Sequence, residues 1–209
     1  MIKILIADDH PLVREGLKKI LRDERDMRVV CEASNGQEVM RFVGKEDLSV
    51  LVLDITMPGL GGLDVLKYVK KKNPKLPILM LSMHPQERFA LRALKMGAAG
   101  YLSKESVPLE LVKAIRKVVS GGKYVTPSLA EELASGVASG NRPRHESLSD
   151  REFEIMCLIA SGKTVREIAE ELYLSANTVN TYRLRLLEKM NMKSNAELIH
   201  YAVRNRFVE

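Results

Sequence analysis

The chain has 209 residues, of which 45% are hydrophobic and 29% are charged, and its net charge is +6. This balance is typical of a globular protein with packed cores and excludes a disordered chain, and the length favours two small domains over one. No segment approaches the roughly 20 apolar residues of a membrane helix, and the N-terminal apolar run is too short for a signal peptide. We therefore expect a cytoplasmic protein with no membrane partner.

The positive charge is unevenly distributed along the chain. Residues 1–123 carry 22 basic and 15 acidic side chains, whereas residues 146–209 carry nine basic and ten acidic ones. A net positive charge suggests a nucleic-acid partner. Because the C-terminal part is not basic overall, evidence for DNA binding must come from the local placement of charge within it.

Short apolar runs alternate with amphipathic segments through residue 120. The runs are rich in β-branched residues and leucine, as buried strands are, and they lie at residues 2–7, 28–33, 50–53, 78–81 and 99–102. Segments with apolar residues at helical spacing lie at residues 12–21, 37–43, 63–71, 87–96 and 109–119. Five strands alternating with five helices predict an α/β domain over residues 1–120, with a parallel sheet covered on both faces.

Gly121 and Gly122 interrupt this pattern, and small and polar residues follow as far as residue 146. We interpret residues 121–146 as a linker, with a short helix near residues 129–133.

The remaining segment, residues 147–209, shows no strand pattern and predicts an all-α domain of four helices. The first three span residues 150–160, 165–172 and about 176–190, and Ser194 begins a fourth that ends near residue 205. Ser149 followed three residues later by Glu152 predicts a capping box at the first helix.

Three aspartates and a lysine stand at the ends of predicted strands. Asp8 and Asp9 end the first strand, Asp54 ends the third, and Lys104 follows the fifth. If the strand order is 2-1-3-4-5, the three carboxylates meet at the edge where such sheets bind ligands. Carboxylates this close repel one another unless a cation lies among them, and oxygen ligands suit Mg²⁺. A carboxylate can also attack phosphorus, and a lysine can bind phosphoryl oxygens, so the four residues together predict phosphoryl chemistry.

Residues 1–120 resemble the receiver domain of two-component response regulators, which has a flavodoxin-like (βα)5 fold. The resemblance lies in Asp8-Asp9-His10, Val52-Leu53-Asp54-Ile55-Thr56-Met57-Pro58-Gly59, Leu81-Ser82 and Gly100-Tyr101-Leu102-Ser103-Lys104. Glu105 departs from the family, in which proline often follows the lysine, so the geometry of that loop is not carried over.

The resemblance implies a role for each residue of this cluster. It implies that Asp54 accepts a phosphoryl group from a histidine kinase and that Lys104 contacts that group. Ser82 would turn toward the phosphoryl group, and Tyr101 would move with it. Mg²⁺ would be bound by Asp9, Asp54, the Thr56 carbonyl and, less directly, Asp8.

Residues 165–190 have the pattern of a helix-turn-helix. The second helix buries Val179, Leu186 and Met190 and presents asparagine, threonine and arginine on the opposite face, side chains that can contact base edges in a major groove. A helical hairpin with a solvated face has the same spacing, so spacing alone leaves both interpretations open. The candidate DNA contacts are Asn177, Thr178, Asn180, Thr181, Arg183, Leu184, Arg185, Lys189 and Lys193.

Residues 147–209 resemble the LuxR-type DNA-binding domain of NarL/FixJ response regulators. The matching residues are Leu148-Ser149-Asp150-Arg151-Glu152, Ala160-Ser161-Gly162, Glu167-Ile168-Ala169, Leu174-Ser175, Thr178-Val179 and Leu186-Leu187-Glu188-Lys189-Met190. Asn180-Thr181-Tyr182-Arg183 is most similar to the GacA/UvrY and BvgA subgroup. Many members have lysine in place of Asn180, so base preference is not carried over. Arg183 lies near the core side of the helix, where it either reaches out to a phosphate or pairs with a carboxylate of a neighbouring helix.

Together the two halves predict a DNA-binding transcription regulator and not an enzyme. Phosphorylation of Asp54 would control dimerisation and promoter binding, with a homodimer formed through an apolar stripe of the last helix at Ala196, Ile199, Ala202 and Val203. An aspartyl-phosphate phosphatase is one alternative, but such enzymes carry Asp-x-Asp, whereas Thr56 stands two residues after Asp54. A DNA-binding protein switched by a small ligand is another, but it would not need three carboxylates at one sheet edge.

Overall fold

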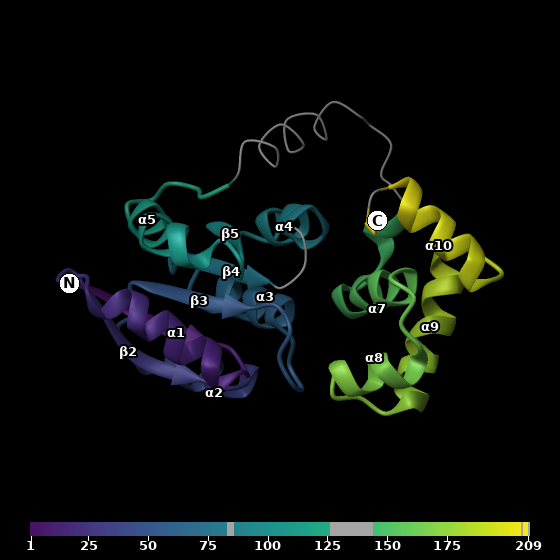
Figure 1. Cartoon of the computed structure of the whole chain (residues 1–209), viewed down its shortest axis with the longest axis horizontal. Helices are drawn as coiled ribbons and strands as arrows, with labels where there is room; N and C mark the ends of the chain where they lie inside the picture. Colours follow the sequence, from purple (N-terminus) through teal and green to yellow (C-terminus); the bar gives the residue numbers. More distant parts are fainter. Residues whose placement is uncertain (83–85, 126–143, 206, 209) are drawn as a thin grey trace. The chain divides into compact units, whose positions relative to one another are not determined.

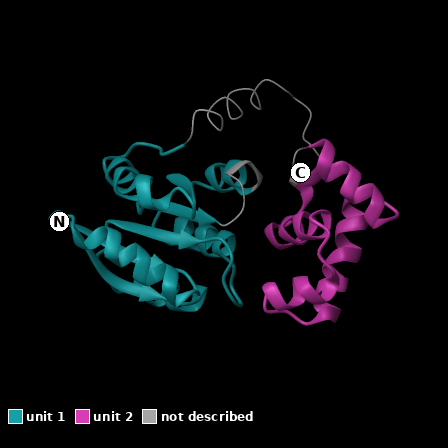
Figure 2. Ribbon diagram, viewed as in Figure 1, with its two compact units in different colours: residues 1–134 teal, residues 135–209 magenta. Residues whose placement is uncertain are grey.

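The computed structural model describes residues 1–82, 86–125, 144–205, 207 and 208. The chain forms two compact units, Met1–Ala134 and Ser135–Glu209 (Figure 2). Among the described helices, none is long and apolar enough to cross a membrane.

The first unit is a parallel five-stranded sheet with its connecting helices (Figure 1). The strand order is β2-β1-β3-β4-β5, which confirms the predicted flavodoxin-like topology. The bounds of the elements differ from the predicted ones by at most a residue or two, the usual uncertainty of helix and strand ends. They are β1 (Ile2–Ala7), α1 (Pro11–Arg22), β2 (Met27–Ala33), α2 (Gly36–Val43), β3 (Val50–Asp54), α3 (Gly62–Lys72), β4 (Ile78–Ser82), α4 (Gln86–Lys95), β5 (Gly100–Ser103) and α5 (Val107–Val119).

Both faces of the central strands of this sheet are buried. Alternate strand residues, including Ile4 and Val52, pack with the apolar sides of α1 and α5 in one core cluster. The residues between them, such as Leu5, Leu51 and Met80, are fully buried on the opposite face. Continuous burial explains why the central strands are uninterrupted apolar runs, because a strand covered on both sides leaves no position for a solvated side chain. In β3 and β4 the only polar residues are therefore the last ones, Asp54 and Ser82.

The second unit is all-helical: η1 (Arg144–Ser147), α7 (Asp150–Ala160), α8 (Val165–Glu171), α9 (Ala176–Met190) and α10 (Asn195–Arg204). The predicted capping box is confirmed, because Ser149 accepts from the Glu152 backbone N–H and Glu152 accepts from that of Ser149. Thr164 and Glu167 form a second one at α8. These caps satisfy N–H groups that each helix start leaves unpaired, which fixes where the short helices begin.

The described ends of the predicted linker pack against their neighbours in the chain. Tyr124 is buried and forms a backbone bridge with Gly100 of β5. On the other side, the His145 ring lies 4.6 Å edge-on from that of Phe207, and Arg144 donates to the Met190 carbonyl at 3.3 Å. Both segments thus belong to packed units, and the predicted helix near residues 129–133 lies outside the described residues.

Candidate functional site

The three aspartates meet at the carboxyl edge of the sheet. Asp54 is the last residue of β3 and Asp8 follows β1, and the register pairs Ala7 with Leu53, so the two aspartates end neighbouring strands. Asp8, Asp9, His10 and Asp54 each place one potential ligand atom within 4.8 Å of all the others. The predicted convergence therefore exists in the structure.

Lys104 lies between two of these carboxylates. Its Nζ is 2.7 Å from Asp8 Oδ2 and 2.8 Å from Asp54 Oδ2, and only 7% of its side chain is exposed. The Lys104 backbone N–H donates to the Ser82 carbonyl at 2.7 Å, which holds the start of this loop against β4. The lysine is thus a buried cation in contact with the candidate phosphoacceptor.

Burial and neighbouring charges perturb the protonation of this cluster. Burial raises the pKa of Asp54 to about 7, with Asp8 and Asp9 adding to the rise and the Lys104 ammonium opposing it. Burial alone would lower the pKa of Lys104, but Asp54 and Asp8 outweigh it, and the net pKa is raised. The lysine is therefore firmly charged, while the Asp54 carboxylate carries an unfavourable charge that a further cation would stabilise.

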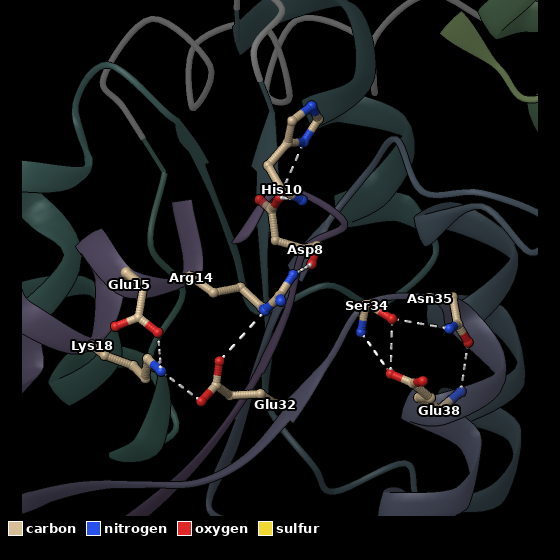
Figure 3. A network of polar contacts seen from close by, with 9 residues as sticks. All are labelled: Asp8, His10, Arg14, Glu15, Lys18, Glu32, Ser34, Asn35 and Glu38. Carbon is tan, nitrogen blue, oxygen red and sulfur yellow. Dashed lines mark hydrogen bonds and ion pairs between the residues drawn. The ribbon is translucent and has the colours of Figure 1, made fainter. Parts of the chain in front are cut away.

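A network behind the cluster orients Asp8. The His10 backbone N–H donates to Asp8 Oδ1 at 2.8 Å, and Arg14 donates to the Asp8 carbonyl at 2.7 Å while its Nε lies 3.4 Å from Glu32 (Figure 3). The His10 ring places Nδ1 2.8 Å from Asp9 Oδ1. The sequence motif contains His10 but does not indicate a role for it. Its position directly after the two aspartates was the only available signal.

Gly62 allows the loop after Asp54 to fold back on β3. Its backbone N–H donates to the Ile55 carbonyl at 2.8 Å, and a Cβ at this position would lie 2.0 Å from the Asp54 carbonyl oxygen. Only glycine fits so close to another backbone. Thr56, the expected carbonyl ligand, is half-buried in this loop, two residues beyond Asp54.

Ser82 and Tyr101 lie on the next two strands. Leu81 pairs with Asp54 in the sheet register, so Ser82 stands one residue further along the adjoining strand, at the same edge. Tyr101 pairs with Met80 and its side chain is buried. All described peptide bonds are trans, including the one that precedes Glu105. The structure thus brings Ser82 to the edge that carries the aspartates and places the Tyr101 ring inside the unit.

The outer face of α9 has the predicted character. Asn177, Thr181 and Arg185 are exposed, and so is Leu184, with 61% of its surface accessible. Arg185 forms no ion pair with any described residue. Two further candidates, Thr178 and Asn180, are half-buried at the sides of this face, and Lys193 is exposed in the turn after the helix.

Two of the basic candidates are engaged within the unit. Lys189 Nζ lies 2.7 Å from Glu152 Oε2, an ion pair with a buried carboxylate. Arg183 donates from Nη1 to Asn195 Oδ1 on α10 at 3.3 Å and is half-buried. The Arg183 partner is thus an amide, which was neither of the two partners expected for it. Helical periodicity predicts the side of α9 on which each side chain lies, but it does not identify the partner on the neighbouring helix.

Two protein families match separate parts of the chain. Residues 4–116 match the response regulator receiver domain, and residues 146–202 match the bacterial regulatory proteins of the luxR family. The chain is 39% identical over 207 residues to the response regulator UvrY of Escherichia coli K12, covering 98% of this chain and 95% of that protein. It is 36% identical over 213 residues to the response regulator GacA of Pseudomonas aeruginosa PAO1, covering 100% and 99%.

Solved structures of response regulators also resemble this chain over most of its length. RcsB from Salmonella enterica serovar Typhimurium, bound to promoter P1flhDC in the presence of the phosphomimetic BeF3⁻, is 28% identical with a TM-score of 0.66, covering 96% of this chain and 97% of that one. A second RcsB structure, from Salmonella typhimurium, is 30% identical with a TM-score of 0.63, covering 97% and 100%.

The fold and the acidic cluster are those of a receiver domain, joined here to a helix-turn-helix DNA-binding domain. The chain belongs to the two-component response regulators of the NarL/FixJ family, whose DNA-binding domain is LuxR-type. Its relatives are DNA-binding transcription regulators.

Proposed function

We propose that a histidine kinase phosphorylates Asp54 in a Mg²⁺-dependent reaction and that phosphorylation promotes dimerisation and promoter binding. The observation that carries the proposal is the Lys104 ammonium in contact with both Asp8 and Asp54, with Asp9 beside them. A carboxylate at the phosphoacceptor position and a buried cation for the phosphoryl oxygens are the two groups that phosphoryl transfer to aspartate requires.

The donor set fits a magnesium ion. Asp8, Asp9 and Asp54 offer hard oxygen ligands within 4.8 Å of one another, and the Asp9 side chain is only 8% exposed. Together with the Thr56 carbonyl, these groups would hold Mg²⁺, which prefers oxygen ligands and retains water positions open to phosphate. When bound, the ion would neutralise the charge on the transferring phosphoryl group.

Each of the chain's own groups then has a defined task. The Asp54 carboxylate oxygen forms a bond to phosphorus while the bond from phosphorus to the imidazole nitrogen of the kinase phosphohistidine breaks, and that nitrogen keeps the electron pair. Lys104 already touches Asp54 and is placed to bind a phosphoryl oxygen as charge develops. His10 and Arg14 keep Asp8 oriented through their contacts with its side chain and carbonyl.

The phosphorylation site can be tested with a small phosphodonor in place of the kinase. Wild type and Asp54→Asn are incubated with acetyl phosphate and MgCl₂, and their intact masses are compared. We expect one added phosphoryl group on wild type, none on Asp54→Asn, and no addition to wild type when EDTA replaces MgCl₂. Asp47→Asn serves as the matched control, because Asp47 is an exposed carboxylate of the same unit. Equal labelling of wild type and Asp54→Asn would refute the assignment.

For DNA binding, we propose that α9 enters the major groove. Its exposed face, with Asn177, Thr181, Leu184 and Arg185, supports base contacts, and the half-buried Thr178 and Asn180 complete that set. Lys193 and, if they leave their partners within the unit, Lys189 and Arg183 would contact phosphates.

For dimerisation, we propose that α10 contributes the symmetric contact. Ala196, Ile199 and Val203 are exposed on this helix, which supports the proposal. Ala202 is fully buried and faces the core, so the apolar stripe expected from the sequence is narrower than four residues. The receiver would act on this contact through the surfaces of α4 and α5, which either shield the DNA-binding helix or pair with a second receiver after phosphorylation.

A further inference from the structure

The net positive charge of the receiver is concentrated partly at the end of the sheet opposite the phosphoacceptor. Six lysines lie in the second half of α3, in the loop that follows it and after α5, toward the amino ends of β4 and β5. We call them the lysine surface: Lys67, Lys70, Lys71, Lys72, Lys75 and Lys123.

Two of these lysines contact the turn before β5. The Lys70 stem passes over Gly97 in the turn before β5, and its Nζ donates to the Leu76 carbonyl at 2.8 Å. Lys123 Nζ donates to the Ala98 carbonyl, the residue after Gly97, at 2.6 Å. Burial, and then the nearby Lys123 charge, lower the pKa of Lys70, which supports the proximity of the two cations. Both ammonium groups are held by neutral carbonyls, so their charges are not compensated.

The other four lysines are exposed, and no ion pair joins any of the six to a carboxylate within the described parts of the chain. Tyr68 lies among them on α3 with 53% of its surface exposed. Positions 67 and 71, and likewise 68 and 72, are four apart and therefore neighbours on one side of the helix. Elsewhere on the same unit, basic side chains such as Lys3, Lys18 and Arg116 are paired with acids.

We propose that the lysine surface binds the sugar–phosphate backbone of the DNA that the second unit occupies. The proposal rests on DNA binding by this chain and adds the receiver as a second source of affinity. Residues 146–209 carry nine basic and ten acidic side chains, so the DNA-binding unit supplies little general attraction for DNA, whereas residues 1–123 carry 22 basic and 15 acidic ones. Unpaired lysines beside an exposed tyrosine suit phosphate contacts without base selection. Because the chain tethers the receiver to bound DNA, even a weak contact would raise the affinity.

The test compares two full-length variants with the same change in net charge. The first carries Lys67→Gln, Lys71→Gln, Lys72→Gln and Lys75→Gln. The matched control carries Arg22→Gln, Arg25→Gln, Arg28→Gln and Lys45→Gln, four exposed basic residues around the starts of β2 and β3, away from β4 and β5 in the strand order. Binding to a fluorescent random-sequence duplex of about 40 base pairs is measured by anisotropy from about 50 to 200 mM KCl, with and without acetyl phosphate.

Each phosphate contact contributes about one unit to the slope of log affinity against log salt. We expect the first variant to lose about two or more units of slope and about tenfold or more in affinity at low salt, and the control to stay close to wild type. Equal behaviour of the two variants would overturn the proposal and leave DNA binding by the second unit intact. Tighter binding by the first variant would also overturn it, because the lysines would then oppose DNA binding. If wild type does not bind the duplex, DNA binding by this chain and the proposal both fail.

Discussion

At the scale of single residues, Asp54 is a carboxylate whose charge is unfavourable in the free protein. Burial raises its pKa to about 7, and two further aspartates lie nearby. Asparagine has the same shape without the charge, and Lys104 would keep its contact with Asp8. We therefore expect Asp54→Asn to raise the free energy of unfolding of the receiver by about 1–2 kcal/mol in EDTA near pH 8. Urea unfolding measures this difference, and Asp47→Asn should show almost no change, because the Asp47 pair with Lys3 is exposed and contributes little. A variant less stable than wild type would contradict the prediction.

Glu152 gives a pH-dependent prediction in the second unit. Burial alone would raise its pKa, but the Lys189 ammonium and the Ser149 N–H outweigh it, and the net pKa is lowered. A carboxyl group whose pKa is lower in the folded than in the unfolded state stabilises the fold at pH values above its unfolded pKa. This stabilisation disappears as the pH falls through the folded pKa. We expect Glu152→Gln to cost about 0.5–1 kcal/mol at neutral pH, because the ion pair is lost while the cap is kept, and less below about pH 4.

The control for this prediction is Glu167→Gln. Glu167 forms the same kind of capping box with Thr164 but is exposed and has no ion pair among the described residues. Chemical unfolding of both variants is measured across the acidic range. If the loss in unfolding free energy of Glu152→Gln stays constant with pH, the ion pair with Lys189 contributes nothing to stability.

Arg185 is the exposed arginine of α9 and is our proposed base contact. Within the described parts of the chain it has no ion pair to give up, whereas Lys189 must leave Glu152 before it can reach a phosphate. We expect Arg185→Ala to weaken binding to a specific promoter by about 1–3 kcal/mol, and Lys193→Ala to lower the salt slope by about one unit with little loss of selectivity. Footprinting and anisotropy titrations measure both effects, and unchanged affinity in both variants would refute the placement of α9.

At the scale of elements, two glycines at helices of the receiver should respond oppositely to the same substitution. A Cβ on Gly62 would lie 2.0 Å from the Asp54 carbonyl oxygen, so the start of α3 or the end of β3 must shift. Gly16 lies inside α1, and apart from its own helix no atom of the described residues lies within 4 Å of its Cβ position. We expect Gly62→Ala to destabilise the receiver by about 1–3 kcal/mol and to slow labelling by acetyl phosphate, and Gly16→Ala to stabilise it by about 0.5–1 kcal/mol. Equal stability changes in the two variants would refute this account.

The elements also show what the sequence could and could not predict. Burial on both faces makes the strands continuous apolar runs, so their number, order of appearance and carboxyl ends follow from the pattern, and with them the position of Asp54. The Ser149 capping box is equally local. In contrast, the partners of Lys189 and Arg183 depend on how helices cross, and the burial of Ala202 depends on which side of α10 faces α7. Periodicity predicts which sides of a helix are apolar and which are polar, but it does not predict which residues of neighbouring helices each side contacts.

At the scale of the whole molecule, the proposed phosphoacceptor and the proposed DNA-binding helix belong to different units. Asp54 belongs to Met1–Ala134 and α9 to Ser135–Glu209. A phosphoryl group on Asp54 can therefore influence DNA binding only by shifting an element with two states. Ser82 ends the strand beside Asp54, and Tyr101 is buried on the strand beyond it. We propose that these two residues connect the acidic cluster to the surface of α4 and α5.

Ser82→Ala tests this route because it removes one hydroxyl and leaves Asp54, Lys104 and the sheet register in place. We expect the variant to accept a phosphoryl group as completely as wild type, since none of the attacking or charge-bearing groups is altered. It should nevertheless lose most of the gain in dimer fraction and DNA affinity on phosphorylation, a coupling that typically amounts to about 5-fold to 150-fold. Ser103→Ala is the matched control, because Ser103 pairs with Ser82 in the register but bonds to Ser106. Intact mass gives the phosphoryl content, and sedimentation and anisotropy give the response. If Ser82→Ala responds as fully as Ser103→Ala, the signal leaves the phosphoacceptor by another path, even though Asp54 remains its origin.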